Sequence, residues 1–82
     1  ASSAPVRVIG TLKKRLSGGT QTYLLESRNH DRVQMDRERI SSKGSYFDLL
    51  RLAPTGQSFL AIGTLEKDGT PPVLTPYFLK KK

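Results

Sequence analysis

The chain has 82 residues, no cysteine and a formal net charge of +7, because 14 Lys and Arg stand against 7 Asp and Glu. A domain of this length buries only about 60% of its unfolded surface, so its core is marginal, and the lack of cysteine excludes disulfides and thiolate metal sites. The positive charge indicates a polyanionic partner, with nucleic acid first and acidic lipid or acidic protein second.

The tetrapeptide Ile-Gly-Thr-Leu occurs twice, at residues 9–12 and 62–65. After each copy come charged residues, a Gly-Thr pair and an aliphatic-aromatic run that ends in a base. Each unit has the pattern of strand, tight turn and strand, so we expect a small β-barrel begun by one hairpin and completed by another. Glycine weakens a strand interior, but it permits the sharp bend that a closing barrel needs.

Three strands are expected in the first half of the chain, over residues 5–16, 22–27 and 32–36. In the first of them Val6, Val8 and Leu12 share one side, and this alternation is the period of a half-buried strand. Residues 17–19 form a glycine turn. A polar turn at 28–31 joins the second and third strands into a hairpin.

The middle of the chain is less regular. Residues 37–44 are polar and predict a loop. Residues 45–53 fit a short helix that Ser45 caps and Pro54 ends, or alternatively a strand. We favour the helix, because closely spaced leucines make a poor alternating strand.

The last two strands are predicted over residues 58–66 and 73–79, joined by a tight turn with the Asp-Gly hairpin signature. Pro71, Pro72 and Pro76 confine the final strand to a sheet edge or an irregular entry.

We expect one domain over residues 1–82, with flexible ends at 1–4 and 80–82. The longest apolar run, at 59–62, is far too short to span a bilayer. No signal sequence is recognisable. We therefore expect an intracellular protein, cytoplasmic or nucleoid-associated, without a membrane partner.

The expected order is three strands, a short helix and two strands, carried by Val6-Arg7-Val8-Ile9-Gly10-Thr11-Leu12, by the hairpin around Asn29-His30, and by the hairpin from 59–65 to Tyr77. In this order the chain resembles the OB-fold, a five-stranded Greek-key barrel. The resemblance implies binding of single-stranded nucleic acid on strands two and three and their flanking loops. An SH3-like barrel is the structural alternative. The chain lacks the tryptophan and long loops of larger OB-fold domains, so a long binding track is not implied.

Groups suited to catalysis are sparse. The single histidine, His30, lies in a polar turn, and the acids at 31 and 36–38 are interleaved with bases, which predicts solvated ion pairs. One histidine and dispersed carboxylates give no metal-ligand spacing, and no glycine pattern matches a phosphate-binding loop. We therefore expect a non-enzymatic protein with no cofactor and no metal.

Basic residues cluster on and between the first three strands, where they are expected to form one positive face that neutralises phosphates. The predicted nucleic-acid-binding bases are Lys13, Lys14, Arg15, Arg28, Arg32, Arg37, Arg39 and Lys43.

Aromatic side chains are needed as flat surfaces on which single-stranded bases stack. Tyr23 lies beside the basic strands and is the best stacking candidate, with a core position as an equal alternative. Tyr77 and Phe78 should point to opposite sides of the last strand, so one of them is expected outside. We include Tyr77 in the predicted site.

The function that these patterns favour is non-enzymatic binding of single-stranded DNA or RNA with low sequence specificity. One alternative is a structural component of a ribonucleoprotein or other assembly. Another is a protein-binding adaptor that pairs a strand edge with a partner. A protein partner or a homo-oligomer is compatible with each of them.

Overall fold

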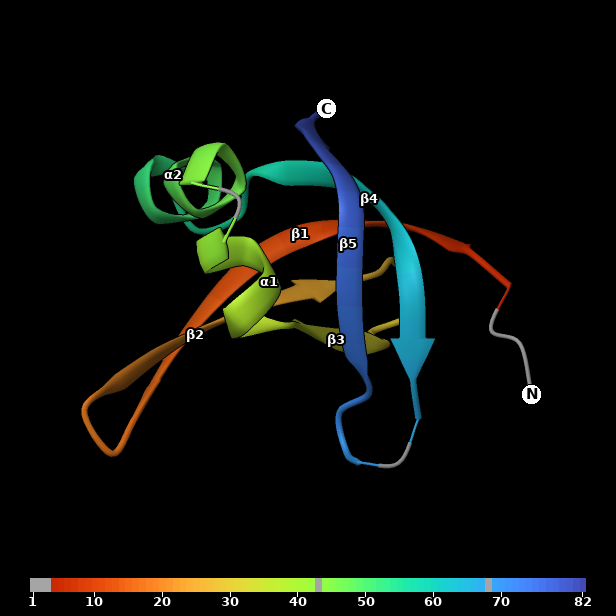
Figure 1. Ribbon diagram of the computed structural model, residues 1–82, viewed down its shortest axis with the longest axis horizontal. Helices are drawn as coiled ribbons and strands as arrows, with labels where there is room; N and C mark the ends of the chain where they lie inside the picture. The colour runs from red at the N-terminus through yellow and green to blue at the C-terminus, as the bar shows by residue number, and fades with distance from the viewer. Residues whose placement is uncertain (1–3, 43, 68) are drawn as a thin grey trace.

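The computed structural model of the protein describes residues 4–42, 44–67 and 69–82. Its elements are β1 (Val6–Ser17), β2 (Thr20–Glu26), β3 (Arg32–Met35), α1 (Arg37–Ser42), α2 (Gly44–Leu52), β4 (Ser58–Glu66) and β5 (Val73–Lys81). The strands form one sheet in the order β1–β2–β3–β5–β4, and the sheet closes in a ring because β4 also pairs with β1 (Figure 1). The expectation of a mainly β protein with five strands in a closing sheet is confirmed.

β1 closes the ring because it is long enough to pair with two different strands. Residues 6–11 pair with β4 and residues 11–17 pair with β2, in both cases antiparallel. The two pairings overlap at Thr11, and the neighbouring Gly10 is buried. β3 adds a short parallel pairing with β5 through Gln34 and Met35.

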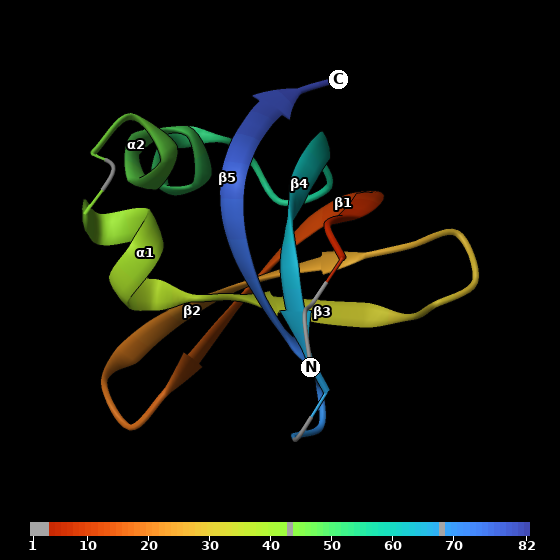
Figure 2. The same cartoon turned by 45° about the vertical axis from the view of Figure 1, so that its right-hand side comes forward.

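The β1–β2 hairpin turns through two glycines with positive φ, 56° at Gly18 and 80° at Gly19. Positive φ at both central residues is the geometry that matches the twist of a two-residue hairpin. β3 pairs only with residues 24–26 of β2, so the outer part of the hairpin projects beyond the sheet as an arm, at the lower left of Figure 2.

A β-bulge interrupts the pairing of β4 with β5. Ile62 pairs with Phe78 and Gly63 pairs with Pro76, which leaves Tyr77 as the extra residue. The bulge reverses the alternation of β5, so Leu74 and Pro76 are buried before it and Leu79 after it. Tyr77 and Phe78 are therefore both exposed, and the prediction that they point to opposite sides is wrong.

Two helices cross over between β3 and β4, where one was predicted. The predicted helix at 45–53 corresponds to α2, but the predicted loop at 37–44 contains α1. Asp36 caps α1, because its Oδ1 accepts hydrogen bonds from the backbone N–H groups of Glu38 (3.0 Å) and Arg39 (3.3 Å). The cap was not recognised because α1 has a single buried apolar side chain, Ile40, and no amphipathic period.

The core fills the interior of the ring and continues under the helices. Phe59, Leu12 and Leu25 from the strands meet Ile40 from α1 and Leu50 from α2 in one cluster. Burial of such side chains, at about 1.5–3 kcal/mol each, is the main force that holds the ring closed. Neither helix in the described part of the chain is long and apolar enough to cross a membrane.

The end of the chain at 80–82 continues along β4, and the expectation of a flexible end there stays a prediction. Lys80 and Lys81 pair with Leu60 and Phe59, and the N–H of Lys82 donates to the carbonyl oxygen of Ser58 at 3.0 Å. At the other end Ala4 is exposed, and residues 1–3 lie outside the described residues.

Candidate nucleic-acid interface

The outer side of β1, β2 and β3 carries a buried leucine surrounded by bases. Leu24 lies between Tyr23 and Leu25 in β2, both of which face the core, so it points outward; yet it is only 3% exposed. It forms the floor of a groove whose walls include Lys13, Arg15 and Arg32. Long basic side chains bury their aliphatic stems on apolar surface and keep their charges in water, and this packing orients the cations along the groove.

This groove is the middle section of a longer track. The section toward the β2–β3 turn, of about 430 Å³, shares Lys13 and Glu26 with it. The section toward the β4–β5 connection, of about 700 Å³, shares Arg15 and Arg32. We call the whole track the basic groove and define it by Lys13, Arg15, Glu26, Arg28, His30 and Arg32.

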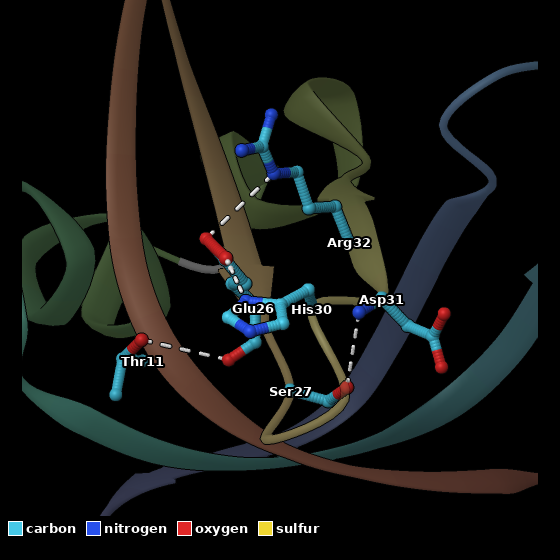
Figure 3. Close-up of polar contacts among 6 residues, drawn as sticks. All are labelled: Thr11, Glu26, Ser27, His30, Asp31 and Arg32. Atoms are coloured by element: carbon cyan, nitrogen blue, oxygen red, sulfur yellow. Dashed lines mark hydrogen bonds and ion pairs between the residues drawn. The ribbon is translucent and has the colours of Figure 1, made fainter.

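Glu26 organises the charges of the basic groove. Its side chain is only 14% exposed. Its Oε2 lies 3.4 Å from His30 Nδ1, and its Oε1 lies 3.6 Å from Arg32 Nε (Figure 3). These contacts hold the arginine and the histidine on the outer side of the sheet. The carboxylate also neutralises part of the positive potential that a phosphate would meet.

The β2–β3 turn places His30 above Glu26. His30 has a φ of 68°, a left-handed conformation that non-glycine residues adopt rarely. Ser27 stabilises the turn, because its Oγ accepts a hydrogen bond from the N–H of Asp31 at 3.2 Å (Figure 3). The backbone N–H of Ser27 donates a second hydrogen bond, to the carbonyl oxygen of Asp31 at 2.8 Å. Arg28, in the same turn, lines the section of the basic groove toward the β2–β3 turn.

Lys14 is directed away from the other bases of β1. It is the register partner of the buried Tyr23, and its Nζ donates to the carbonyl oxygen of Arg51 at 3.1 Å. Arg51 lies in the last turn of α2. A cation beside helix C-terminal carbonyls is favourable, so the Lys14 ammonium stabilises α2, although Lys14 also lines the middle section of the groove.

The predicted bases on the β3–β4 crossover do not join the groove. Arg37 and Arg39 are exposed on α1 and line none of its three sections. Lys43 lies outside the described residues. These bases were grouped with the others because they are close in sequence, but α1 leads the chain away from the sheet after Met35.

Tyr23 is a core residue. It is 6% exposed, and its ring meets that of Phe47 edge-on, with centroids 6.3 Å apart and an interplanar angle of 84°. A buried ring offers no face to a base, so the prediction of Tyr23 as a stacking residue is corrected. Tyr77 is 53% exposed, but it lies at the bulge in β5 and not in the basic groove. Its carbonyl oxygen accepts a hydrogen bond from Tyr46 Oη at 2.9 Å.

The β4–β5 connection is part of the groove and was not foreseen as such. Pro71 and Pro72, together with Leu65, line the section of the basic groove toward this connection. The prolines were considered only as constraints on the last strand. Nothing local in the sequence shows that this connection lies beside Arg15 and Arg32, because those contacts depend on closure of the ring.

Comparison of the chain with known protein families, with curated proteins and with solved structures found no match. Among the described residues, no three His, Asp or Glu side chains are grouped to hold a metal ion. The basic groove is therefore the candidate site.

Proposed function

We propose that this protein is an OB-fold-like barrel that binds single-stranded DNA or RNA in the basic groove, without catalysis and with low sequence specificity. The strand order, the parallel β3–β5 pair and the helical crossover between β3 and β4 support the resemblance to the OB-fold. In OB-folds the face of strands two and three and the loops beside it bind oligonucleotides. The basic groove occupies that face and reaches the β4–β5 connection.

The observation that carries the proposal is the convergence of four cations on one continuous track. Lys13, Arg15, Arg28 and Arg32 come from β1, the β2–β3 turn and β3. Cations spaced along a groove neutralise successive phosphates and release counterions, which supplies most of the affinity in sequence-independent binding.

Low specificity follows from what else lines the groove. The lining that the structure describes contains one aromatic ring, the imidazole of His30, and no Asn or Gln side chain. Asn and Gln read adenine through paired donor and acceptor contacts, and the described lining lacks them. Strong binding of bases requires stacking on aromatic rings. Phosphate contacts are therefore expected to supply most of the binding free energy.

Binding of labelled oligo-dT, oligo-rU and a duplex, measured at several salt concentrations, tests the proposal. We expect the single strands to bind more tightly than the duplex, with a log–log salt slope of about −0.7 for each phosphate contacted. Comparable affinity for the duplex would argue against the single-strand assignment.

A pair of matched variants tests the location. Lys13→Glu with Arg15→Glu reverses two charges in the groove, and Arg37→Glu with Arg39→Glu reverses two on α1. The first pair should weaken binding far more than the second and flatten the salt slope. Equal losses would mean that net charge matters and the groove does not.

A further inference from the structure

A second exposed surface lies on the outer side of β1, β4 and β5. The strand register aligns two rows across these strands. One row contains Arg7, Ile62 and Phe78, and the other contains Ile9, Leu60 and Lys80. The four apolar side chains of the two rows are adjacent, and we call them the apolar patch: Ile9, Leu60, Ile62 and Phe78.

The apolar patch is open to solvent. Ile9 is 46% exposed and Phe78 is 39% exposed, while Leu60 and Ile62 between them are half-buried. Single exposed apolar residues are normal on protein surfaces, but these are adjacent on three strands and form a contiguous patch, a feature that interaction sites share. The β5 bulge contributes to it, because it turns Phe78 outward and leaves Tyr77 exposed beside it.

The charges in these rows are all positive. Arg7 flanks Ile62, and Lys80 flanks Leu60. Neither cation forms an ion pair within the part of the chain that the structure describes, and neither row contains a carboxylate. Two copies of this chain joined through the patch would bring these cations together without compensation, in a molecule whose net charge is already +7. A second copy is therefore a poor occupant.

We propose that the apolar patch binds a short segment of a partner protein in which apolar side chains alternate with Asp or Glu. The apolar side chains would cover Ile62 and Phe78, and the carboxylates would pair with Arg7 and Lys80. Buried apolar contacts supply affinity in such an interface, and complementary charges supply register and partner choice. The apolar patch adjoins the basic groove, because Ile9 also lines the section of the groove toward the β2–β3 turn.

Designed fluorescent peptides test the proposal by anisotropy. One peptide alternates Leu or Phe with Asp or Glu, a second has Ser in place of every acid, and a third has Ser in place of every apolar residue. We expect the first to bind, the other two to bind at least about tenfold more weakly, and salt to reduce binding. Failure of the first peptide to bind would overturn the proposal.

Variants of the protein locate the binding. Lys80→Glu and Phe78→Ser should each weaken the first peptide about tenfold, equivalent to 1.4 kcal/mol. Lys81→Glu is the matched control: it makes the same change of charge one residue away, at the position paired with the buried Phe59. Leu52→Ser controls for loss of an exposed apolar side chain, since Leu52 is 70% exposed on α2. Equal effects of Lys80→Glu and Lys81→Glu would overturn the proposal.

Three further measurements separate rival occupants. The Lys13→Glu, Arg15→Glu double variant should still bind the peptide. It would lose a peptide that bound in the basic groove. Oligonucleotide affinity should be unchanged in Phe78→Ser, and a large loss would instead make Phe78 a stacking surface. Sedimentation should show a monomer. A dimer that the Phe78→Ser substitution dissociates would make a second copy of the chain the occupant of the patch.

Discussion

Gly10 in β1 lies directly against the backbone of Glu26 in β2: a Cβ atom at Gly10 would stand 2.8 Å from the Glu26 carbonyl oxygen. Gly63, its counterpart in the repeated tetrapeptide, lies still more closely against β5, where a Cβ would overlap the Thr75 carbonyl oxygen and stand 2.8 Å from the Cα of Pro76. Both repeated glycines therefore occur where two strands approach too closely for a side chain. One of these approaches positions the residue that organises the basic groove.

Alanine at either glycine should destabilise the fold. Because the neighbouring atoms are backbone and cannot rotate away, we expect Gly10→Ala and Gly63→Ala each to cost about 1–3 kcal/mol or more, as in other overpacked sites. Gly44→Ala is the control, since no atom lies within 4 Å of a Cβ there, and it should be neutral or slightly stabilising. Urea denaturation of the three variants measures the difference. A Gly63→Ala protein as stable as Gly44→Ala would contradict the close approach.

Removal of the Glu26 charge should strengthen nucleic-acid binding. Glu26→Gln keeps the size of the side chain, releases Arg32 and His30, and removes a negative charge from the groove. We expect oligo-dT affinity to rise severalfold and stability to fall by no more than about 1 kcal/mol, because both partners of Glu26, His30 and Arg32, are exposed and ion pairs with exposed groups are weak. Glu66→Gln makes the same change of charge at an exposed position that lines no section of the groove and should have the smaller effect on affinity. A loss of affinity in Glu26→Gln would mean that the carboxylate is needed to hold Arg32 in place.

Substitutions of Lys14 and of Lys13 should differ in their effects on stability and on oligonucleotide affinity, although the two residues are adjacent in the sequence. Lys14→Ala removes the hydrogen bond to the Arg51 carbonyl oxygen and should cost about 0.3–1 kcal/mol of stability with little change in oligonucleotide affinity. Lys13→Ala should weaken binding and leave the melting temperature nearly unchanged. Thermal unfolding and anisotropy on both proteins compare the two effects. Equal losses of affinity would show that the Lys14 ammonium also faces the nucleic acid.

Tyr23 should behave as a core residue. Tyr23→Ala deletes a buried ring and should cost about 3–5 kcal/mol, as other aromatic-to-alanine changes in cores do. Tyr23→Phe keeps the contact with Phe47 and should leave stability and oligonucleotide affinity close to those of the original protein. Circular dichroism melts and binding assays on both variants distinguish the roles. A folded Tyr23→Ala protein with normal stability and weak binding would restore Tyr23 to the interface.

Much of the secondary structure was predictable because strand patterns are local. Alternation in β1, the double glycine at 18–19 and the turns around β2 and β4 place the strand bounds within about two residues of those observed. α2 was recognised from its closely spaced leucines and its terminating proline, but Ser45, the predicted cap, lies inside the helix, which begins at Gly44. α1 was not, because a single buried residue, Ile40, gives no period to detect.

The candidate site depended more on tertiary structure. The sequence identified the cationic cluster on β1 and beside the β2–β3 turn, but adjacent residues of a strand point to opposite sides, and only closure of the ring shows that Lys13 faces the groove while Lys14 contacts α2. The bulge that exposes Tyr77 and Phe78 together likewise arises from pairing with β4, between residues far apart in the chain. Composition and local patterning thus determined a basic, mainly β protein. Strand register, which depends on long-range backbone pairing, decided which side chains form the basic groove, which form the apolar patch and which are buried.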